Sequence, residues 1–219
     1  MKVTALKAQT RNPARVNVYL DGKFAFGLAK IEAIRLRVGQ ELDEAAVARL
    51  QQADDEEQAY ERALKLLSIR PRSEDEIRRK LREHKVTEET IGAVLAHLRR
   101  AGLVDDAAFA NYWVENRATF RPRSQRMLKA ELKRKGVGEA ALTQALAETN
   151  DAEAAYTLAA KRVRSAKLAE GPYPDFRRKL GDYLARRGFD YETIGPVVER
   201  LWKESHSGDR VEGDAFEID

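Results

Sequence analysis

The sequence predicts a mainly α-helical protein: an elongated array of three tandem three-helix repeats of helix-turn-helix-like type, preceded by a small element that contains a β-hairpin. Three observations support this prediction. Apolar residues recur with helical spacing after residue 53, a sequence pattern recurs at offsets of 51 and then 52 residues, and alternation of apolar and polar residues is confined to the start of the chain. Helical periodicity with internal self-similarity is typical of repeat architectures.

The β-hairpin is predicted from alternation on both sides of a turn. Apolar residues alternate with polar ones over residues 15–20, Asp21-Gly22 follows, and Phe24 and Phe26 alternate on the return. An Asp-Gly pair tolerates the positive φ angles of a two-residue turn. Residues 3–8 are expected to add a third strand, since an isolated hairpin is only marginally stable.

The strand pattern stops near Leu28. Asp43 and Glu44 have the side chains that favour a helix start, and the sequence predicts a short helix from there through Leu50. We therefore expect residues 1–53 to form the N-terminal element, with its hairpin and short helices.

The repeats are recognised from matching residues. Arg70-Pro71-Arg72-Ser73 recurs 51 positions later as Arg121-Pro122-Arg123-Ser124, and Glu89-Thr90-Ile91-Gly92 recurs 103 positions later as Glu192-Thr193-Ile194-Gly195. The expected boundaries are 54–106, 107–151 and 152–204 for the three repeats, with an acidic flexible tail over residues 205–219.

Each repeat is expected to contain three helices. In the first repeat, a Pro at position 71 interrupts one apolar stripe, and Ser73 with Glu76 forms a capping box that opens the second helix. Thr87 is expected to cap the third helix, whose inner face holds Ile91 and Leu95. Short turns join the second and third helices, as in a helix-turn-helix.

Composition excludes several classes of chemistry. The 219 residues include no Cys, which rules out disulfides, Cys-ligated metals and a thiol nucleophile. The three His residues are isolated, and no metalloprotease, phosphate-loop or dinucleotide motif occurs. We expect no enzyme activity, no catalytic residues, no metal and no cofactor. No apolar run is long enough for a membrane span or a signal peptide, so the expected location is the cytoplasm.

The formal charge of +4 at pH 7 hides an uneven distribution. Residues 1–58 are neutral, residues 59–204 carry +8, and residues 205–219 carry −4. A basic body without catalytic chemistry indicates nucleic acid or another polyanion as a partner. The third helices begin with carboxylates such as Glu88, Glu139 and Asp190, which would repel DNA, so an operator-binding repressor is disfavoured.

The positive charge lies in the proline turns and on the second helices instead. Arg126, Lys129 and Lys133 are spaced to share one helical face, opposite Leu128 and Leu132. We call these three cations the basic stripe; such contacts bind the DNA backbone without reading sequence. The candidate nucleic-acid-binding residues are Arg70, Arg72, Arg117, Arg121, Arg123, Arg126, Lys129, Lys133, Arg177 and Arg178. The alternative is that the cations only keep a helix face solvated.

The aromatic side chains allow two interpretations. Phe109, Tyr112 and Trp113 have the spacing of a helix core, which we favour over base-stacking platforms. Phe120 and Tyr173, each expected in a loop before a repeat's proline, are less easily assigned to a core, and base stacking stays open for both.

Four segments of the first two repeats form a distinctive combination: Ala63-Leu64-Lys65-Leu66-Leu67, Arg70-Pro71-Arg72-Ser73-Glu74, Ala101-Gly102-Leu103-Val104-Asp105-Asp106 and Phe109-Ala110-Asn111-Tyr112-Trp113. With these segments the chain resembles a known family, RecX, the regulators of the RecA recombinase. The resemblance is distinctive over about residues 54–140, looser over 141–204, and includes the hairpin of the longer RecX forms.

The resemblance implies a non-enzymatic partner of the RecA filament on single- or double-stranded DNA. Such a protein would inhibit ATP hydrolysis and strand exchange, and so limit recombination, DNA repair and the SOS response to damage. We expect a monomer with nonspecific DNA contacts and no membrane association. The alternative is an α-helical repeat interaction protein with a partner that is not a nucleic acid.

Overall fold

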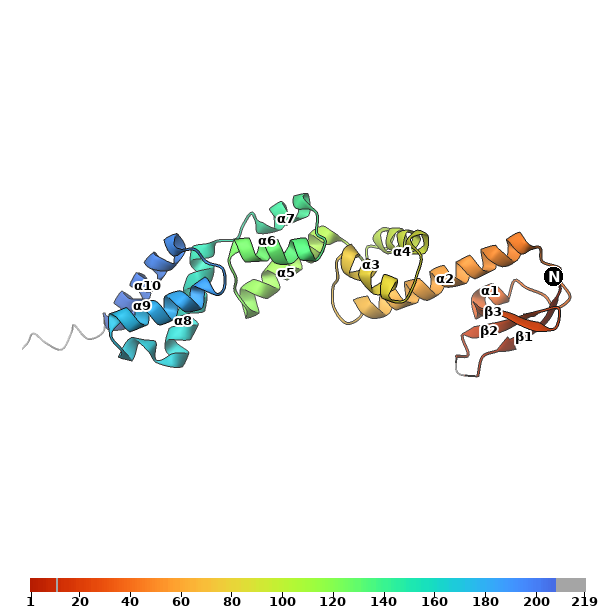
Figure 1. Cartoon of the computed structure of the whole chain (residues 1–219), viewed down its shortest axis with the longest axis horizontal. Helices are drawn as coiled ribbons and strands as arrows, with labels where there is room; N and C mark the ends of the chain where they lie inside the picture. Colours follow the sequence, from red (N-terminus) through yellow and green to blue (C-terminus); the bar gives the residue numbers. More distant parts are fainter. Residues whose placement is uncertain (11, 208–219) are drawn as a thin grey trace, which may run out of the picture. The chain divides into compact units, whose positions relative to one another are not determined.

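The computed structural model describes residues 1–10 and 12–207 (Figure 1). Within this range the chain forms a three-stranded sheet followed by ten α-helices and one short 3₁₀ helix. The α-helices from α2 onward form three bundles of three. The described residues form two compact units, Met1–Asp105 and the part from Asp106 onward. Four separate hydrophobic clusters fill the sheet element and three helical bundles. The predicted fold of a small β element and three tandem three-helix repeats is confirmed.

The N-terminal sheet is antiparallel, in the order β1 (Val3–Ala8), β2 (Arg15–Leu20) and β3 (Lys23–Ala29). The predicted turn joins β2 to β3. Asp21 and Gly22 have φ angles of 49° and 82°, the two positive values that this class of hairpin turn requires. Both the hairpin and the third strand are therefore confirmed.

The sheet buries one face beneath the helices that follow it. Alternate residues of β2, beginning with Val16 and Val18, are buried together with Leu28 and with Ala33 of the short helix α1 (Lys30–Ala33). Val47 and Leu50 on the next helix pack against this cluster. The alternation of the sequence thus corresponds to a sheet with a core side and a solvent side.

Helix α2 (Glu44–Leu67) is much longer than predicted. It begins where expected, because the Asp43 carboxylate accepts a hydrogen bond from the amide of Ala46. The predicted end at Leu50 was wrong, since the helix continues into the first bundle and buries Ala59 and Ala63 there. The segment contains no Gly or Pro that would end a helix.

A buried carboxylate holds α2 to the sheet. Asp54 is 5% exposed and accepts hydrogen bonds from the guanidinium of Arg15 (2.6 Å), the amide of Ala29 (3.0 Å) and the side chain of Gln58 (2.7 Å). Because all its partners are donors, the charge is compensated where it is buried. One helix therefore serves two hydrophobic clusters in the unit Met1–Asp105.

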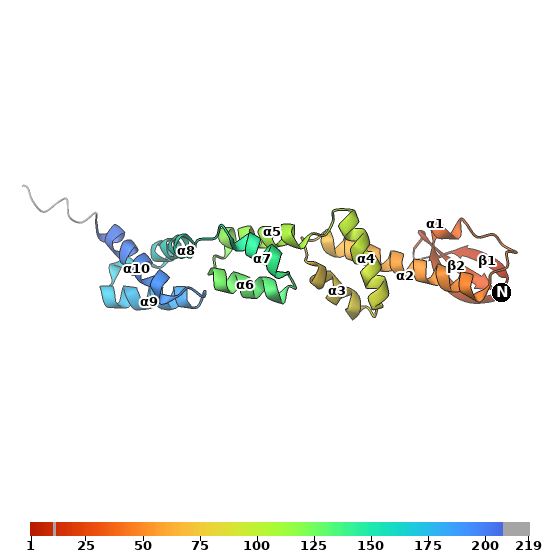
Figure 2. The same ribbon diagram turned by 90° about the horizontal axis from the view of Figure 1, so that it is seen from above.

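The first bundle is completed by α3 (Glu74–Glu83) and α4 (Glu88–Arg100). Both caps are as predicted: the hydroxyl of Ser73 accepts from the amide of Glu76, and that of Thr87 accepts from the amide of Thr90. Ile91 and Leu95 are buried in the bundle. Figure 2 shows α3 and α4 packed together at one end of α2.

The unit from Asp106 onward contains the second and third bundles. The second consists of α5 (Asp106–Phe120), α6 (Gln125–Arg134) and α7 (Glu139–Leu146); the third consists of α8 (Asp151–Ala166), the 3₁₀ helix η1 (Leu168–Glu170), α9 (Tyr173–Ala185) and α10 (Tyr191–His206). Ser205 and His206, predicted as part of the acidic tail, belong to α10. The rest of that predicted tail, from residue 208, lies outside the described residues.

A tight backbone contact joins these two bundles. The amide of Ser124, at the start of α6, donates to the carbonyl of Arg187 in the turn before α10 (3.1 Å). The neighbouring Gly188 is buried and has a φ angle of 91°; a β-carbon there would lie 2.6 Å from Oγ of Ser124 and collide with the side chain of Met127. Glycine is therefore required by both conformation and space.

Candidate nucleic-acid interface

Helix α6 carries the basic stripe. The helix begins at Ser124, whose hydroxyl accepts from the amide of Met127, and it buries Leu128 and Leu132. All three cations of the stripe lie on the exposed side of this helix. The separation of a charged face from an apolar face is therefore as the spacing predicts.

Two candidate arginines near the stripe are turned inward instead. Glu131, on the buried side of α6, is 8% exposed. Nε of Arg117 and the indole of Trp113 each donate to its Oε2 at 2.8 Å, and Nε of Arg123 lies 3.0 Å from Oε1 in an ion pair. We call these four residues the Glu131 cluster, which connects α5 and the proline turn to α6.

The electrostatics of the Glu131 cluster favour the charged carboxylate. Burial acts to raise the pKa of Glu131, but hydrogen bonds from Arg117 and Trp113, with the nearby charge of Arg123, outweigh burial and lower it. The guanidinium of Arg117 also lies over the Trp113 ring, 4.3 Å from its centroid. Arg117 and Arg123 are thus partly buried structural cations.

The two lysines of the stripe share one carboxylate at the start of the next helix. Lys129 and Lys133 lie 2.8 and 3.1 Å from the carboxylate of Glu139, and their side chains are 46% and 53% exposed. Their hydrogen bonds lower the pKa of Glu139. Exposed pairs of this kind are weak, so both lysines keep ammonium surface available to a phosphate.

The same arrangement occurs 51 positions earlier, in the first bundle. Arg78 and Arg82 on α3 both pair with Glu88 at the start of α4. All three positions correspond to those of the second bundle. In the third bundle the equivalent positions hold Gly181, Ala185 and Tyr191, which cannot form the pair. A link between the second and third helices is thus built into the first two repeats.

Arg121 is exposed because its repeat partner is missing. In the first repeat the matching Arg70 pairs with Glu76 at 2.9 Å. The position of Glu76 is occupied by Met127 in the second repeat, and within the described residues no carboxylate lies at ion-pair distance from the Arg121 side chain. The side chain of Arg121 is the most accessible cation of the proline turns.

Arg126 has only weak intramolecular contacts. Its Nη2 lies 3.4 Å from the carbonyl of Gly188, and its charge adds a small effect to the Thr193 hydrogen bonds that lower the pKa of Asp190. Arg121, Arg126, Lys129 and Lys133 are therefore the exposed candidate cations of the second repeat.

The remaining candidates are dispersed. Arg72 is half-buried and donates through Nε to the carbonyl of Leu66. Arg177 is exposed, with no ion pair within the described part of the chain, whereas Arg178 lies 3.4 Å from Asp175. Four of the ten candidates are exposed on α6 and in the turn before it.

The aromatic predictions have mixed outcomes. Phe109 is buried and Trp113 packs against the core, but Tyr112 is 37% exposed, so its core assignment was wrong. Tyr173 is not in a loop; it begins α9 and packs against Trp202, with ring centroids 5.2 Å apart. Phe120 ends α5 and is 74% exposed, which leaves its ring accessible beside Arg121 in the sequence.

Two kinds of feature are absent from the described residues. No helix within residues 1–10 and 12–207 combines the length and apolar character needed to cross a bilayer. Over the same ranges, no group of three or more His, Asp or Glu side chains is placed to hold a metal ion.

Sequence reasoning missed the Glu131 cluster, although a signal for it was present. Glu131 lies between Leu128 and Leu132 on the apolar side of a predicted helix. A carboxylate in that position needs cationic or hydrogen-bonding partners, because burial of an unpaired charge is costly. That argument would have assigned one or two neighbouring arginines to it.

A small antiparallel sheet followed by tandem helix-turn-helix-like bundles defines the class: a helical repeat protein with basic patches. Four family models match in the order of these parts: the regulatory protein RecX N-terminal domain over residues 1–43, and the first, second and third three-helix domains of RecX over residues 59–98, 105–146 and 149–198. The chain belongs to the RecX family of regulatory proteins.

Relatives and solved structures agree with this membership. The chain is 35% identical over 205 residues to the regulatory protein RecX of Levilactobacillus brevis, covering 91% of this chain and 76% of that protein. It is 30% identical over 211 residues to that of Bacillus licheniformis, covering 94% and 80%. A crystal structure of regulatory protein RecX matches with a TM-score of 0.68 and 32% identity over 91% of this chain and 100% of that one. RecX from Lactobacillus salivarius matches with a TM-score of 0.58 and 26% identity, covering 68% and 97%.

Proposed function

We propose that this protein is a negative regulator of the RecA recombinase that binds the RecA–DNA filament and inhibits ATP hydrolysis and strand exchange. Membership of the RecX family is the observation that carries this proposal. A non-enzymatic binding role is consistent with a surface whose distinguishing feature is charge. By this action the protein limits recombination and the SOS response in the cytoplasm.

Strand exchange tests the proposed inhibition. RecA is assembled on circular single-stranded DNA, linear duplex is added, and joint molecules are followed on gels with and without this protein. We expect product formation to slow as the protein is titrated in. An unchanged yield at excess protein would contradict the inhibition of strand exchange.

We propose further that the exposed cations of the second repeat contact DNA phosphates without reading sequence. Arg121, Arg126, Lys129 and Lys133 support this proposal because they are exposed and bound weakly or not at all within the described chain. Arg70, Arg72, Arg177 and Arg178 have a supporting role in it. Arg117 and Arg123 contribute long-range charge, since their guanidinium groups bind Glu131.

The salt dependence of DNA binding tests the phosphate contacts. Labelled single-stranded DNA is titrated with the wild type and with the triple variant R121A/R126A/K129A at several salt concentrations. Each lost phosphate contact is expected to reduce the log–log salt slope by about 0.7. The matched control is K161A/R164A/K203A, which removes the same charge from exposed residues of α8 and α10.

The two sets of outcomes separate the alternatives. Phosphate contact at this surface is supported if the triple variant binds DNA more weakly and with a smaller salt dependence, while the control variant binds DNA almost as wild type does. Equal binding by both variants would mean that the wrong face was chosen. No DNA binding at low salt would favour a repeat protein whose partner is not a nucleic acid.

A further inference from the structure

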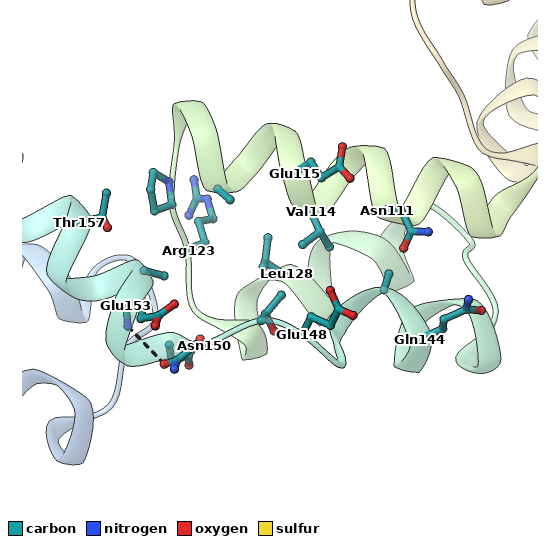
Figure 3. Close-up of a pocket in the computed structure, with 16 residues that line it drawn as sticks. Asn111, Val114, Glu115, Arg123, Leu128, Gln144, Glu148, Asn150, Glu153 and Thr157 are labelled. Carbon is teal, nitrogen blue, oxygen red and sulfur yellow. Dashed lines mark hydrogen bonds between the residues drawn. The ribbon is translucent and has the colours of Figure 1, made fainter.

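A second surface of the unit that begins at Asp106 has the opposite charge. It is a cleft of about 590 Å³, lined by α5, α6, α7, the start of α8, the turn before α6 and the connection between α7 and α8 (Figure 3). Val114, Leu128 and Ala145 contribute an apolar floor. Val114 from α5 and Leu128 from α6 point into the same space in Figure 3. An apolar floor of this kind favours a ligand that brings apolar surface of its own.

Carboxylates surround this floor. Glu115, Glu148 and Glu153 line the cleft and are exposed, and within the described part of the chain no Lys or Arg nitrogen lies within 4 Å of their carboxylates. Asp151 also lines the cleft, but its carboxylate accepts a hydrogen bond from the backbone amide of Gln125 at 2.7 Å. We call this feature the acidic cleft.

The one cation of the lining does not balance this charge. Arg123 reaches the cleft from the proline turn, but its guanidinium pairs with Glu131, which is itself a carboxylate. Arg117 shares the same carboxylate, so these three side chains together carry one positive charge. The three exposed glutamates exceed this charge and give the acidic cleft a net negative charge. A phosphate backbone would be repelled here, in contrast to the surface of the basic stripe.

We propose that the acidic cleft binds a protein segment that presents Lys or Arg beside an apolar side chain, and that this segment belongs to RecA. The apolar residues and the exposed glutamates of the cleft determine the chemistry of the segment. That the segment belongs to RecA rests on the proposed function. The chain's own C-terminal residues are the wrong occupant, since residues 208–219 carry five acidic residues and one Arg. DNA and protein would thus be held by two surfaces of opposite charge within one unit.

The role of the three exposed glutamates is tested by removing their charge while keeping the shape of their side chains. The cleft variant is E115Q/E148Q/E153Q, and the matched control is D182N/E192Q/E199Q, which removes the same charge from exposed residues of α9 and α10. Binding of each full-length protein to RecA filaments on single-stranded DNA, and to the DNA alone, is measured by fluorescence anisotropy. A fourth protein, A118W, narrows the cleft by enlarging an exposed residue that lines it.

We expect the cleft variant and A118W to bind filaments about tenfold more weakly than wild type, while the control variant does not weaken. Binding to DNA alone should not weaken in any of them. Filament affinity of the cleft variant equal to that of the control would overturn the acidic cleft as a docking surface.

A second measurement keeps this proposal separate from the proposed function. The methyl resonances of Val114 and Leu128 are followed while the peptide acetyl-(Leu-Lys-Lys-Leu)₃-amide is added to the wild type and to the cleft variant. Shifts in the wild type that are lost in the variant support the cleft chemistry even if RecA does not bind. Absence of shifts at millimolar peptide would overturn the cleft chemistry, and failure of wild type to bind filaments would overturn the proposed function instead.

Discussion

At the scale of single residues, Glu131 determines which neighbouring arginines are available at the surface. A carboxylate on the buried side of α6 has withdrawn Arg117 and Arg123 from the surface, and Trp113 completes its hydrogen bonds. The neighbouring Arg121 has no such partner because Met127 replaces the glutamate that binds Arg70 in the first repeat. Glu131 matches Lys80 of the first repeat, so two differences between the repeats decide which of these arginines are structural and which are exposed.

Replacement of Glu131 with Gln is expected to destabilise the protein. The change leaves two partly buried guanidinium groups without a counter-charge; with allowance for their partial exposure we expect a loss of about 2 kcal/mol in the free energy of unfolding. Urea denaturation at pH 7 measures the loss. The matched control E139Q changes an exposed carboxylate and should stay within about 0.5 kcal/mol of wild type.

The difference in the free energy of unfolding between wild type and E131Q should depend on pH. The pKa of Glu131 is lowered in the folded state, so its contribution is complete above the unfolded-state value of about 4.3. The contribution is lost as the pH falls through the folded-state pKa. The gap between wild type and E131Q should therefore narrow below about pH 4. A gap at pH 3 as large as at pH 7 would contradict the assignment.

At the scale of elements, the second and third helices of the first two repeats are linked by ion pairs. Lys129 and Lys133 with Glu139 match Arg78 and Arg82 with Glu88. This carboxylate compensates part of the charge of the basic stripe. Glu139, in the first turn of α7, therefore weakens the electrostatic attraction between α6 and a polyanion.

Removal of that carboxylate should tighten DNA binding. In E139Q the stripe lysines lose their shared counter-charge, and we expect single-stranded DNA to bind about two- to fivefold more tightly at low salt, with the gain screened above about 0.15 M. Fluorescence anisotropy against salt concentration measures it. E192Q, on the first turn of α10, is the control for charge alone; an equal gain in both variants would exclude a specific effect of Glu139 on the stripe.

The joint between the second and third bundles depends on one glycine. Gly188→Ala places a β-carbon against Ser124 and Met127 at a positive φ angle, and we expect a loss of about 3 kcal/mol in stability. Gly92→Ala is the matched control, because Gly92 lies in α4 with open space around it and should gain up to about 1 kcal/mol. Thermal denaturation compares the two, and equal midpoints would contradict a tight joint.

Local signals in the sequence account for much of this fold. Asp21-Gly22 predicted the hairpin turn, and Ser73 and Thr87 predicted helix starts that the structure places as expected. The end of α2 could not be predicted, because its continuation past Leu50 depends on two clusters, one at each end of the helix. Local chemistry gives little information on how one helix is shared between cores.

The candidate site was less predictable than the fold. Spacing placed the basic stripe on the exposed face of α6, but pairing is decided between helices: Arg117 on α5 meets Glu131 on α6. The acidic cleft combines residues from four helices, α5 to α8, and from two of the segments that connect them. Which of the ten candidate cations contact DNA stays a prediction.

At the scale of the whole molecule, charge is unevenly distributed along the chain. Residues 59–204 carry +8, whereas residues 208–219 carry −4. Within the unit that begins at Asp106, the stripe and the acidic cleft have opposite signs. A chain of this kind can attract a polyanion and a cationic protein segment at the same time.

Removal of the acidic C-terminal residues should tighten DNA binding if they compete for the basic surface. A variant ending at Ser207 lacks five acidic residues and one Arg, and we expect higher affinity for single-stranded DNA at about 0.02 M salt, with the difference fading as salt screens the charges. A full-length chain with the five acids changed to amides is the control and should behave alike. Unchanged affinity in both would leave these residues a solubilising role only.

The DNA-dependent ATPase of RecA is the most direct test of our proposal that this chain regulates RecA through the filament on DNA. The rate of ATP hydrolysis is measured on single-stranded DNA while the full-length protein is titrated to excess over RecA. We predict a progressive fall in rate, with R121A/R126A/K129A less effective than K161A/R164A/K203A. A rate that stays constant at excess protein would contradict the claim.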